Sequence, residues 1–77
     1  MITPADFDAI IAAVGSFRIG APMMIEDIRL ACWADGHLLT HLTGREIATV
    51  LARVADAEPH PTLGHYNLWR ARPEVFA

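Results

Sequence analysis

The hydrophobic positions between Leu42 and Asp56 follow the period of an amphipathic helix. Apolar residues recur at the i, i+3, i+4, i+7 spacing of one buried helical face, namely Ile47, Val50, Leu51 and Val54. Thr43 followed three residues later by Glu46 forms a capping box, which satisfies two backbone amides that a helix start leaves without partners. The pattern predicts a helix that begins after Thr43 and continues to Asp56.

A first helix is predicted from Pro4 to Gly15. Thr3 is its N-cap, Pro4 takes the favoured first helical position, and Asp6 completes the cap. One face is apolar at helical spacing and consists of Phe7, Ile10, Ile11 and Val14. Gly15 is well placed to stop the helix.

A second helix is predicted from Met24 to Trp33, with apolar side chains along one side at Ile25, Ile28 and Cys32. Before it, the run 17–19 predicts a short strand, followed by a turn around Gly20 and Pro22. After it, residues 37–42 form a short connector to the third helix.

The C-terminal part alternates with the period of a strand. Between residues 66 and 72, one face carries Tyr66, Leu68 and Arg70, and the other carries Asn67 and Trp69. Prolines at positions 59 and 61 forbid further helix before this strand. Gly64 permits the tight turn of a hairpin, and a short tail follows residue 73. A C-terminal β-hairpin is therefore predicted.

These elements predict an α+β, mostly α fold, with three helices and a C-terminal β-hairpin in a single domain over residues 1–77. A chain of this length has room for one core. Its content of 53% hydrophobic and 19% charged residues argues against disorder. No apolar run approaches the roughly 18 residues that span a bilayer. No basic segment typical of a signal peptide precedes the first helix, and Cys32 has no second cysteine to pair with. We expect a cytoplasmic protein.

Charge is divided unevenly along the chain, whose net charge is −3. Residues 1–35 carry five acidic residues against two arginines, whereas residues 36–77 carry four acidic residues, four arginines and all four histidines. The first part is therefore acidic, and the second is neutral and becomes cationic as histidine protonates.

An arginine-bearing stripe lies opposite the buried face of the third predicted helix, because Arg45, Thr49 and Arg53 are spaced four residues apart. Together with two hairpin arginines, this stripe gives the candidate contacts to phosphates and base edges: Arg45, Thr49, Arg53, Arg70 and Arg72. The alternative is a solvated helix face in which Arg53 pairs with Asp56. The acidic net charge also weakens simple electrostatic binding to nucleic acid.

The element order resembles the winged-helix variant of the helix-turn-helix family. Residues 42–54, LTGREIATVLARV, are similar to the T-x-x-E-I-A-x-x-L phrase common in helix-turn-helix domains, and residues 64–70, GHYNLWR, resemble the returning strand of a wing. In many such domains a recognition helix follows this phrase, but the prolines at 59 and 61 leave no room for one. Either the helix after Thr43 is itself the recognition helix, or the fold serves another use. The resemblance implies a non-enzymatic DNA-binding transcription regulator.

The acidic part of the chain supports an alternative function. A negative patch facing an arginine-rich protein complex would form if these side chains converge: Asp6, Asp8, Glu26, Asp27 and Asp35. Small phage inhibitors, including anti-CRISPR proteins, are similar in size and charge, and the alanine- and arginine-rich composition is similar to that of phage and mobile-element proteins. The alternative is thus a protein inhibitor of a nucleic-acid-processing complex. The simpler explanation is that small intracellular domains are commonly acidic.

Metal binding and catalysis have little support in the sequence. Zinc ligands could come from Cys32, His37, His41, His60 and His65, but the 37/41 pair requires a helix there and no C-x-x-C motif accompanies it. A nucleophile elbow, a glycine-rich phosphate loop and a paired acid–base motif are all missing from the sequence. Cys32 is predicted to be a buried structural thiol. We expect no metal, no cofactor and no enzymatic activity.

Trp69 has two interpretations. The adjacent Arg70 suggests stacking or a cation–π contact, but core packing is favoured because tryptophan is highly buried on average. An exposed Trp69 would also permit a homodimer.

Overall fold

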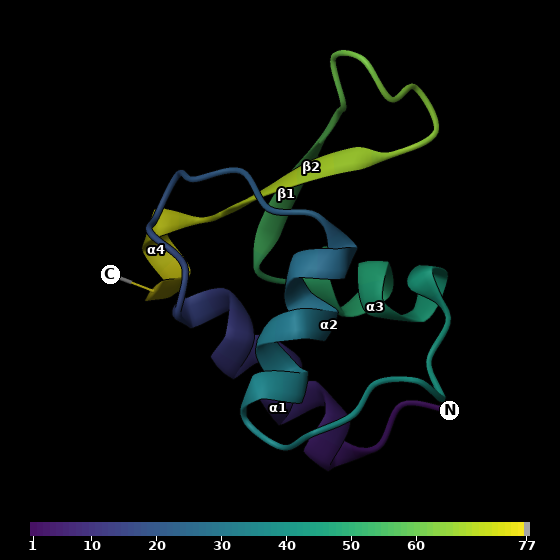
Figure 1. Ribbon diagram of the computed structural model, residues 1–77. Coiled ribbons are helices and arrows are strands. Elements are labelled where there is room, and N and C mark those ends of the chain that lie inside the picture. The colour runs from purple at the N-terminus through teal and green to yellow at the C-terminus, as the bar shows by residue number, and fades with distance from the viewer. Residues whose placement is uncertain (77) are drawn as a thin grey trace.

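The computed structural model describes residues 1–76, which form four helices and one two-stranded antiparallel hairpin (Figure 1). The elements in chain order are α1 (Pro4–Gly15), α2 (Ile25–Ala34), α3 (Gly44–Leu51), β1 (Ala55–Pro59), β2 (Asn67–Ala71) and α4 (Pro73–Phe76). The first three helices pack together, and the hairpin extends away from them toward the top of Figure 1. The predicted α+β, mostly α fold is confirmed.

Two helices begin at the capping boxes that the sequence predicts. Thr3 Oγ1 accepts from the amide of Asp6 at 3.1 Å, and Asp6 Oδ2 accepts from the amide of Thr3 at 3.0 Å. The same exchange joins Thr43 and Glu46 at the start of α3, at 3.1 and 2.9 Å. Each pair satisfies two backbone amides that have no partner within the helix.

The prediction that the third helix continues to Asp56 is wrong, because α3 ends at Leu51 and the strand β1 begins at Ala55. Ala55 pairs with Ala71, and the amide of Arg72 donates to the carbonyl of Val54 at 2.9 Å. Backbone groups that would form hydrogen bonds within a longer helix therefore bond to β2 and to Arg72 instead. Val54 remains buried, so it satisfies the helical pattern without being helical.

The predicted strand over residues 17–19 is also wrong. Gly20 adopts a positive φ of 84°, and the amide of Ala21 donates to the carbonyl of Arg18, so this segment closes a turn. A strand-like contact occurs slightly later, where Met23 and Trp69 exchange backbone hydrogen bonds of 2.9 and 2.8 Å. Trp69 in β2 therefore lies opposite Ala57 of β1 on one side and is hydrogen-bonded to Met23 on the other.

The first strand of the hairpin, β1, begins at Ala55 and includes Pro59 as its last residue. Ala55 pairs with Ala71, Ala57 with Trp69, and Pro59 with Asn67, and residues 60–66 form the loop. Proline is tolerated at this position because β1 is an edge strand that ends there. The predicted turn at residues 63–66 is present, with the amide of Tyr66 donating to the carbonyl of Leu63 at 2.9 Å. The prediction that Gly64 makes the tight turn of the hairpin is wrong, because the loop between the strands spans residues 60–66 and, among the described residues, only Gly20 and Gly36 have a positive φ.

The segment expected to be a tail forms α4, at the left of Figure 1. Phe76 packs beside the C-terminal end of α1, where a Cβ placed on Gly15 would lie 3.5 Å from its ring. The glycine predicted to stop α1 thus also leaves room for this ring.

One core gathers side chains from α1, α2, α3, the hairpin and their connections. Its buried members are Ile10, Ala13, Val14, Met23, Ile28, Cys32, Leu39, Leu42, Ile47, Val50, Leu51, Val54, Ala55, Trp69 and Ala71. Cys32 is buried, as predicted, and burial raises the pKa of its thiol. Within residues 1–76, no helix combines the length and the hydrophobicity needed to cross a bilayer.

We predict that Ile47→Ala lowers the free energy of unfolding by about 2–5 kcal/mol, because it leaves a cavity under α3 at a fully buried position. Urea denaturation measures this loss. Thr49→Ala, on the exposed side of the same helix, is the matched control and should change stability by no more than about 0.5 kcal/mol. Equal losses for the two variants would contradict the orientation of α3.

Candidate functional site

The exposed side of α3 carries the polar stripe that the sequence predicts. Arg45 and Thr49 are exposed on the side opposite Ile47 and Leu51, and the Thr49 hydroxyl donates to the carbonyl of Arg45 at 2.9 Å. Arg53 follows one residue after the C-cap and is also exposed. Although Arg53 lies just past the end of the helix, it borders the same hollow as Thr49, and Thr49 is bonded to Arg45, so the three residues form one surface.

Arg53 and Thr49 border a shallow hollow between α3 and α1. Its volume is about 280 Å³, and the other lining residues are Ile2, Phe7 and Val50. The guanidinium of Arg53 lies 5.8 Å from the centre of the Phe7 ring, which is within the range of a cation–π contact. Among residues 1–76, neither Arg45 nor Arg53 takes part in an ion pair with a carboxylate. Their positive charges are therefore available to a ligand.

The two hairpin arginines have intramolecular partners. Arg70 Nε donates to Glu58 at 2.8 Å, and its Nη1 donates to the carbonyl of Gly20 at 2.6 Å. Arg72 Nε donates to Asp56 at 2.9 Å. Each carboxylate neutralises one arginine, so the paired strands present little net positive charge.

Arg72 also completes the end of α3. Its Nη2 lies 3.1 Å from the carbonyl oxygen of Ala52, and its Nη1 lies 3.4 Å from that of Arg53. Ala52 is the C-cap of α3, and its carbonyl is one that a helix end leaves without an intrahelical donor. The alternative in which Arg53 pairs with Asp56 is wrong, because Asp56 accepts from Arg72 instead.

Asp6 is not part of an acidic surface. Its exposed fraction is 2%, and its two carboxylate oxygens accept from His37 Nε2 at 2.7 Å and His41 Nε2 at 2.9 Å as well as from the amide of Thr3. Hydrogen bonds from the Thr3 amide and the two imidazoles hold the pKa of the Asp6 carboxyl far below its usual range. The predicted acidic patch therefore loses this member, while Asp8, Glu26, Asp27 and Asp35 are exposed.

The four histidines do not gather at one point. His37 and His41 contact Asp6, whereas His60 Nδ1 accepts from the amides of Thr62 and Leu63 in the hairpin loop, at 3.1 and 3.0 Å. The zinc hypothesis required a helix at His37 and His41, but the connector that carries these two residues is not helical. In the part of the chain that the structure describes, no group of three or more potential ligands is arranged to hold a metal ion.

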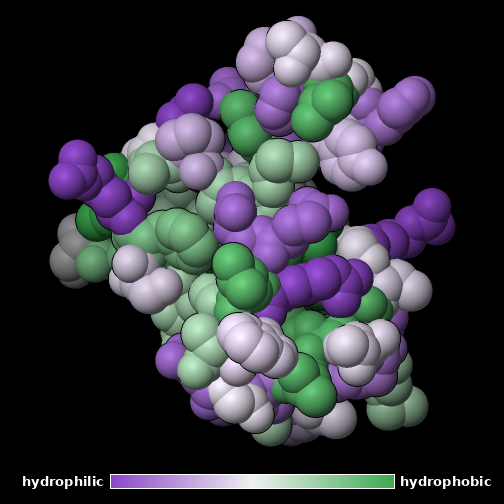
Figure 2. Space-filling model, viewed as in Figure 1, coloured by the Kyte–Doolittle hydropathy of each residue, from purple (hydrophilic) through white to green (hydrophobic). Residues whose placement is uncertain are grey.

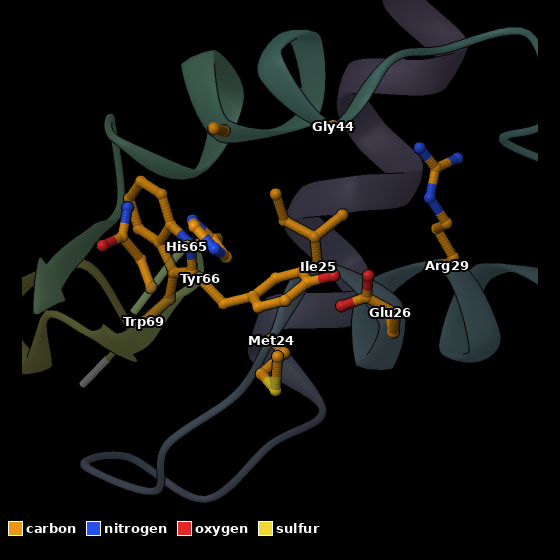
Figure 3. Close-up of a pocket in the computed structure, with 10 residues that line it drawn as sticks. Met24, Ile25, Glu26, Arg29, Gly44, His65, Tyr66 and Trp69 are labelled. Atoms are coloured by element: carbon orange, nitrogen blue, oxygen red, sulfur yellow. The ribbon is translucent and has the colours of Figure 1, made fainter. Parts of the chain in front are cut away.

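A pocket that the sequence did not predict lies between the hairpin and the starts of α2 and α3 (Figure 3). Its volume is about 320 Å³. It is lined by Met24, Ile25, Glu26, Arg29, Gly44, Ala48, His65, Tyr66, Asn67 and Trp69. In Figure 3 the Tyr66 ring reaches from the hairpin toward Ile25. The residues come from three distant segments, so no sequence motif could have identified the pocket.

Arg29 is a structural residue that the sequence analysis also missed. Its guanidinium donates to the carbonyls of Leu39 and Leu42, at 2.8 and 2.9 Å. It thereby ties the connector that leads into α3 to the side of α2. An arginine at position 29 has no distinguishing sequence signal, because its two acceptors are backbone carbonyls.

We predict that the protein loses stability as pH falls below about 4. The Asp6 pKa is lower in the folded state than its ordinary value of 3.8, so the unfolded state takes up the proton first and is favoured by acid. Urea midpoints between about pH 7 and pH 2 measure the effect, and Asp6→Asn should flatten the acidic part of the profile. Asp8→Asn, which removes an exposed carboxylate of α1, is the control and should leave the profile almost unchanged. Indistinguishable profiles for the two variants would contradict the role of Asp6.

Comparisons with protein-family models, with curated proteins and with solved structures found no match to this chain.

Proposed function

We propose that this protein is a non-enzymatic DNA-binding regulator of the winged-helix type, with α3 as its recognition helix. The observation that carries the proposal is the exposed side of α3, where Arg45, Thr49 and Arg53 lie together and both guanidinium groups lack a carboxylate partner among the described residues. Arginine and threonine are suited to contacting phosphates and base edges from a helix in the major groove.

The arrangement around α3 supports this proposal. A hairpin follows the helix directly, and Met23, between α1 and α2, pairs with the returning strand. This order of helix, strand-like segment, two helices and hairpin is what the winged-helix resemblance implies. The N-terminus of α3 is fixed by its capping box and its C-terminus by Arg72. A rigid helix loses little conformational freedom when it binds.

The hairpin arginines have a supporting part in the proposal. Arg70 and Arg72 were expected to contact nucleic acid, but their pairs with Glu58 and Asp56 cancel their charge. Both pairs are substantially exposed, so each stabilises the fold by less than about 1 kcal/mol. A phosphate could compete with either carboxylate, but the main electrostatic contribution comes from α3.

We predict that the double variant Arg45→Ala, Arg53→Ala weakens DNA binding and lowers its salt dependence. Removing two phosphate-contacting charges should reduce the slope of log K against log salt by about 2. Fluorescence anisotropy with a random duplex of about 30 base pairs, across a series of roughly 25–200 mM salt, measures both quantities.

Arg18→Ala is the matched control for this experiment. Arg18 is an exposed arginine in the turn between α1 and α2, so its removal changes the net charge without touching α3. The control should change the slope by less than about 0.5. If the double variant keeps the wild-type slope, or if the wild type does not bind at the lowest salt, the proposal is wrong.

A second candidate function is a protein inhibitor of the phage or anti-CRISPR type, binding an arginine-rich complex through acidic residues. The observation that favours it is that three of the four exposed members of the predicted acidic patch, Glu26, Asp27 and Asp35, lie on α2 or at its end. Reversing the charges of Asp8, Glu26 and Asp27 should abolish capture of such a complex. Capture that survives the reversal would exclude this function.

A further inference from the structure

The pocket between the hairpin and the starts of α2 and α3 has no part in DNA binding through the exposed side of α3. Its volume of about 320 Å³ lies at the lower end of the range for small-molecule sites, roughly 300–1,000 Å³. In Figure 2 the surface is indented at the right, where Figure 1 places the hairpin above the starts of α2 and α3. This helix–hairpin pocket is large enough for one molecule of the size of an amino acid.

Aromatic and apolar side chains form much of the wall of the helix–hairpin pocket. Trp69 is only 6% exposed and belongs to the core, so the idea of a homodimer through Trp69 is wrong. Tyr66 is 48% exposed, and in Figure 3 its ring reaches from the hairpin toward Ile25. A ligand with an aromatic ring could cover the exposed part of the Tyr66 ring, since aromatic pairs favour stacked or edge-to-face packing.

Two opposite charges line the same pocket. Glu26 and Arg29 lie three residues apart on α2, and in Figure 3 both side chains extend from α2 toward the part of α3 that holds Gly44. Within residues 1–76, neither of them forms an ion pair. Arg29 uses two of its five N–H groups on backbone carbonyls of the connector, so the others can still donate to a ligand.

We infer that the helix–hairpin pocket binds a free aromatic amino acid. The α-ammonium group of the ligand pairs with the Glu26 carboxylate, its α-carboxylate accepts from the guanidinium of Arg29, and its ring packs against Tyr66 and Ile25. The charged groups fix the orientation of the ligand, and burial of the ring provides affinity. The inference does not depend on whether α3 binds DNA.

The two charges favour a zwitterion over other small molecules. A ligand with only a positive charge pairs with Glu26 but is repelled by Arg29, and a ligand with only a negative charge has the reverse problem. A neutral apolar ligand displaces water from both charged groups and gives neither of them a partner. An amino acid carries both charges at one end and an apolar side chain at the other, as the lining of the pocket requires.

The fluorescence of Trp69 tests the inference, because this residue lines the pocket. The chain has a second tryptophan, Trp33, which is 62% exposed, so the variant Trp33→Phe leaves Trp69 as the single reporter. The probe is L-phenylalanine, which does not absorb where tryptophan is selectively excited. We predict a saturable change in Trp69 fluorescence with phenylalanine, and much weaker binding of phenethylamine and hydrocinnamate, which each lack one of its two charges.

Variants of the lining residues, each made in the Trp33→Phe background, locate the site. Glu26→Gln keeps the shape of the side chain and removes its charge, so it should weaken phenylalanine binding about tenfold. Tyr66→Ala should also weaken binding, because it removes the aromatic contact. The role of Arg29 is tested with the ligand that lacks a carboxylate, since replacing Arg29 would also release the connector.

Two matched controls use exposed residues that do not line the pocket. Glu74→Gln removes an exposed carboxylate of α4, and Leu63→Ala shortens an exposed side chain in the same hairpin loop as Tyr66. Both controls should bind phenylalanine as the Trp33→Phe variant does.

Three results would overturn the inference. The first is no saturable change in Trp69 fluorescence up to about 10 mM phenylalanine, a concentration at which even a weak ligand of this size would be bound. The second is binding of phenethylamine or hydrocinnamate within about twofold of phenylalanine, because one charge would then be sufficient. The third is equal binding by the Glu26→Gln and Glu74→Gln variants. None of these results depends on the DNA titration, so the two proposals fail separately.

Discussion

The Asp6 carboxylate joins the start of α1 to the connector between α2 and α3. It accepts from the Thr3 amide, which fixes the first turn of α1, and from the imidazoles of His37 and His41. The connector has no regular backbone pattern, so side-chain contacts of this kind determine its path. Arg29 adds the second attachment through two carbonyls of the connector. The position at which α3 begins, and hence the direction of its exposed face, depends on these two attachments.

Five of the six arginines divide into two groups by what their guanidinium groups contact. Arg29, Arg70 and Arg72 donate to backbone carbonyls, and the two in the hairpin also pair with carboxylates across the strands. Arg45 and Arg53 remain on the exposed side of α3. Arginine suits the structural role because its planar fork can reach two acceptors at once. This division explains how a protein with a net charge of −3 can still present one local cationic surface.

The proposed functions use different helices and different physical interactions. The α3 face offers positive charge and hydrogen-bond donors, whereas Glu26 and Asp27 place negative charge on the first turn of α2. Charge on α2 therefore opposes nucleic acid, and charge on α3 attracts it.

The sequence by itself determined the capped starts of α1 and α3, the helical extent of α2 and the presence of a C-terminal hairpin, because these depend on hydrogen bonds and hydrophobic periods within a few residues. Only the tertiary structure decided where α3 ends, since Ala55 is drawn into pairing with Ala71. It also decided that Asp6 is buried against His37 and His41, and that Trp33 rather than Trp69 is exposed. These outcomes depend on contacts between residues far apart in the chain, which local patterns of charge and hydrophobicity do not encode.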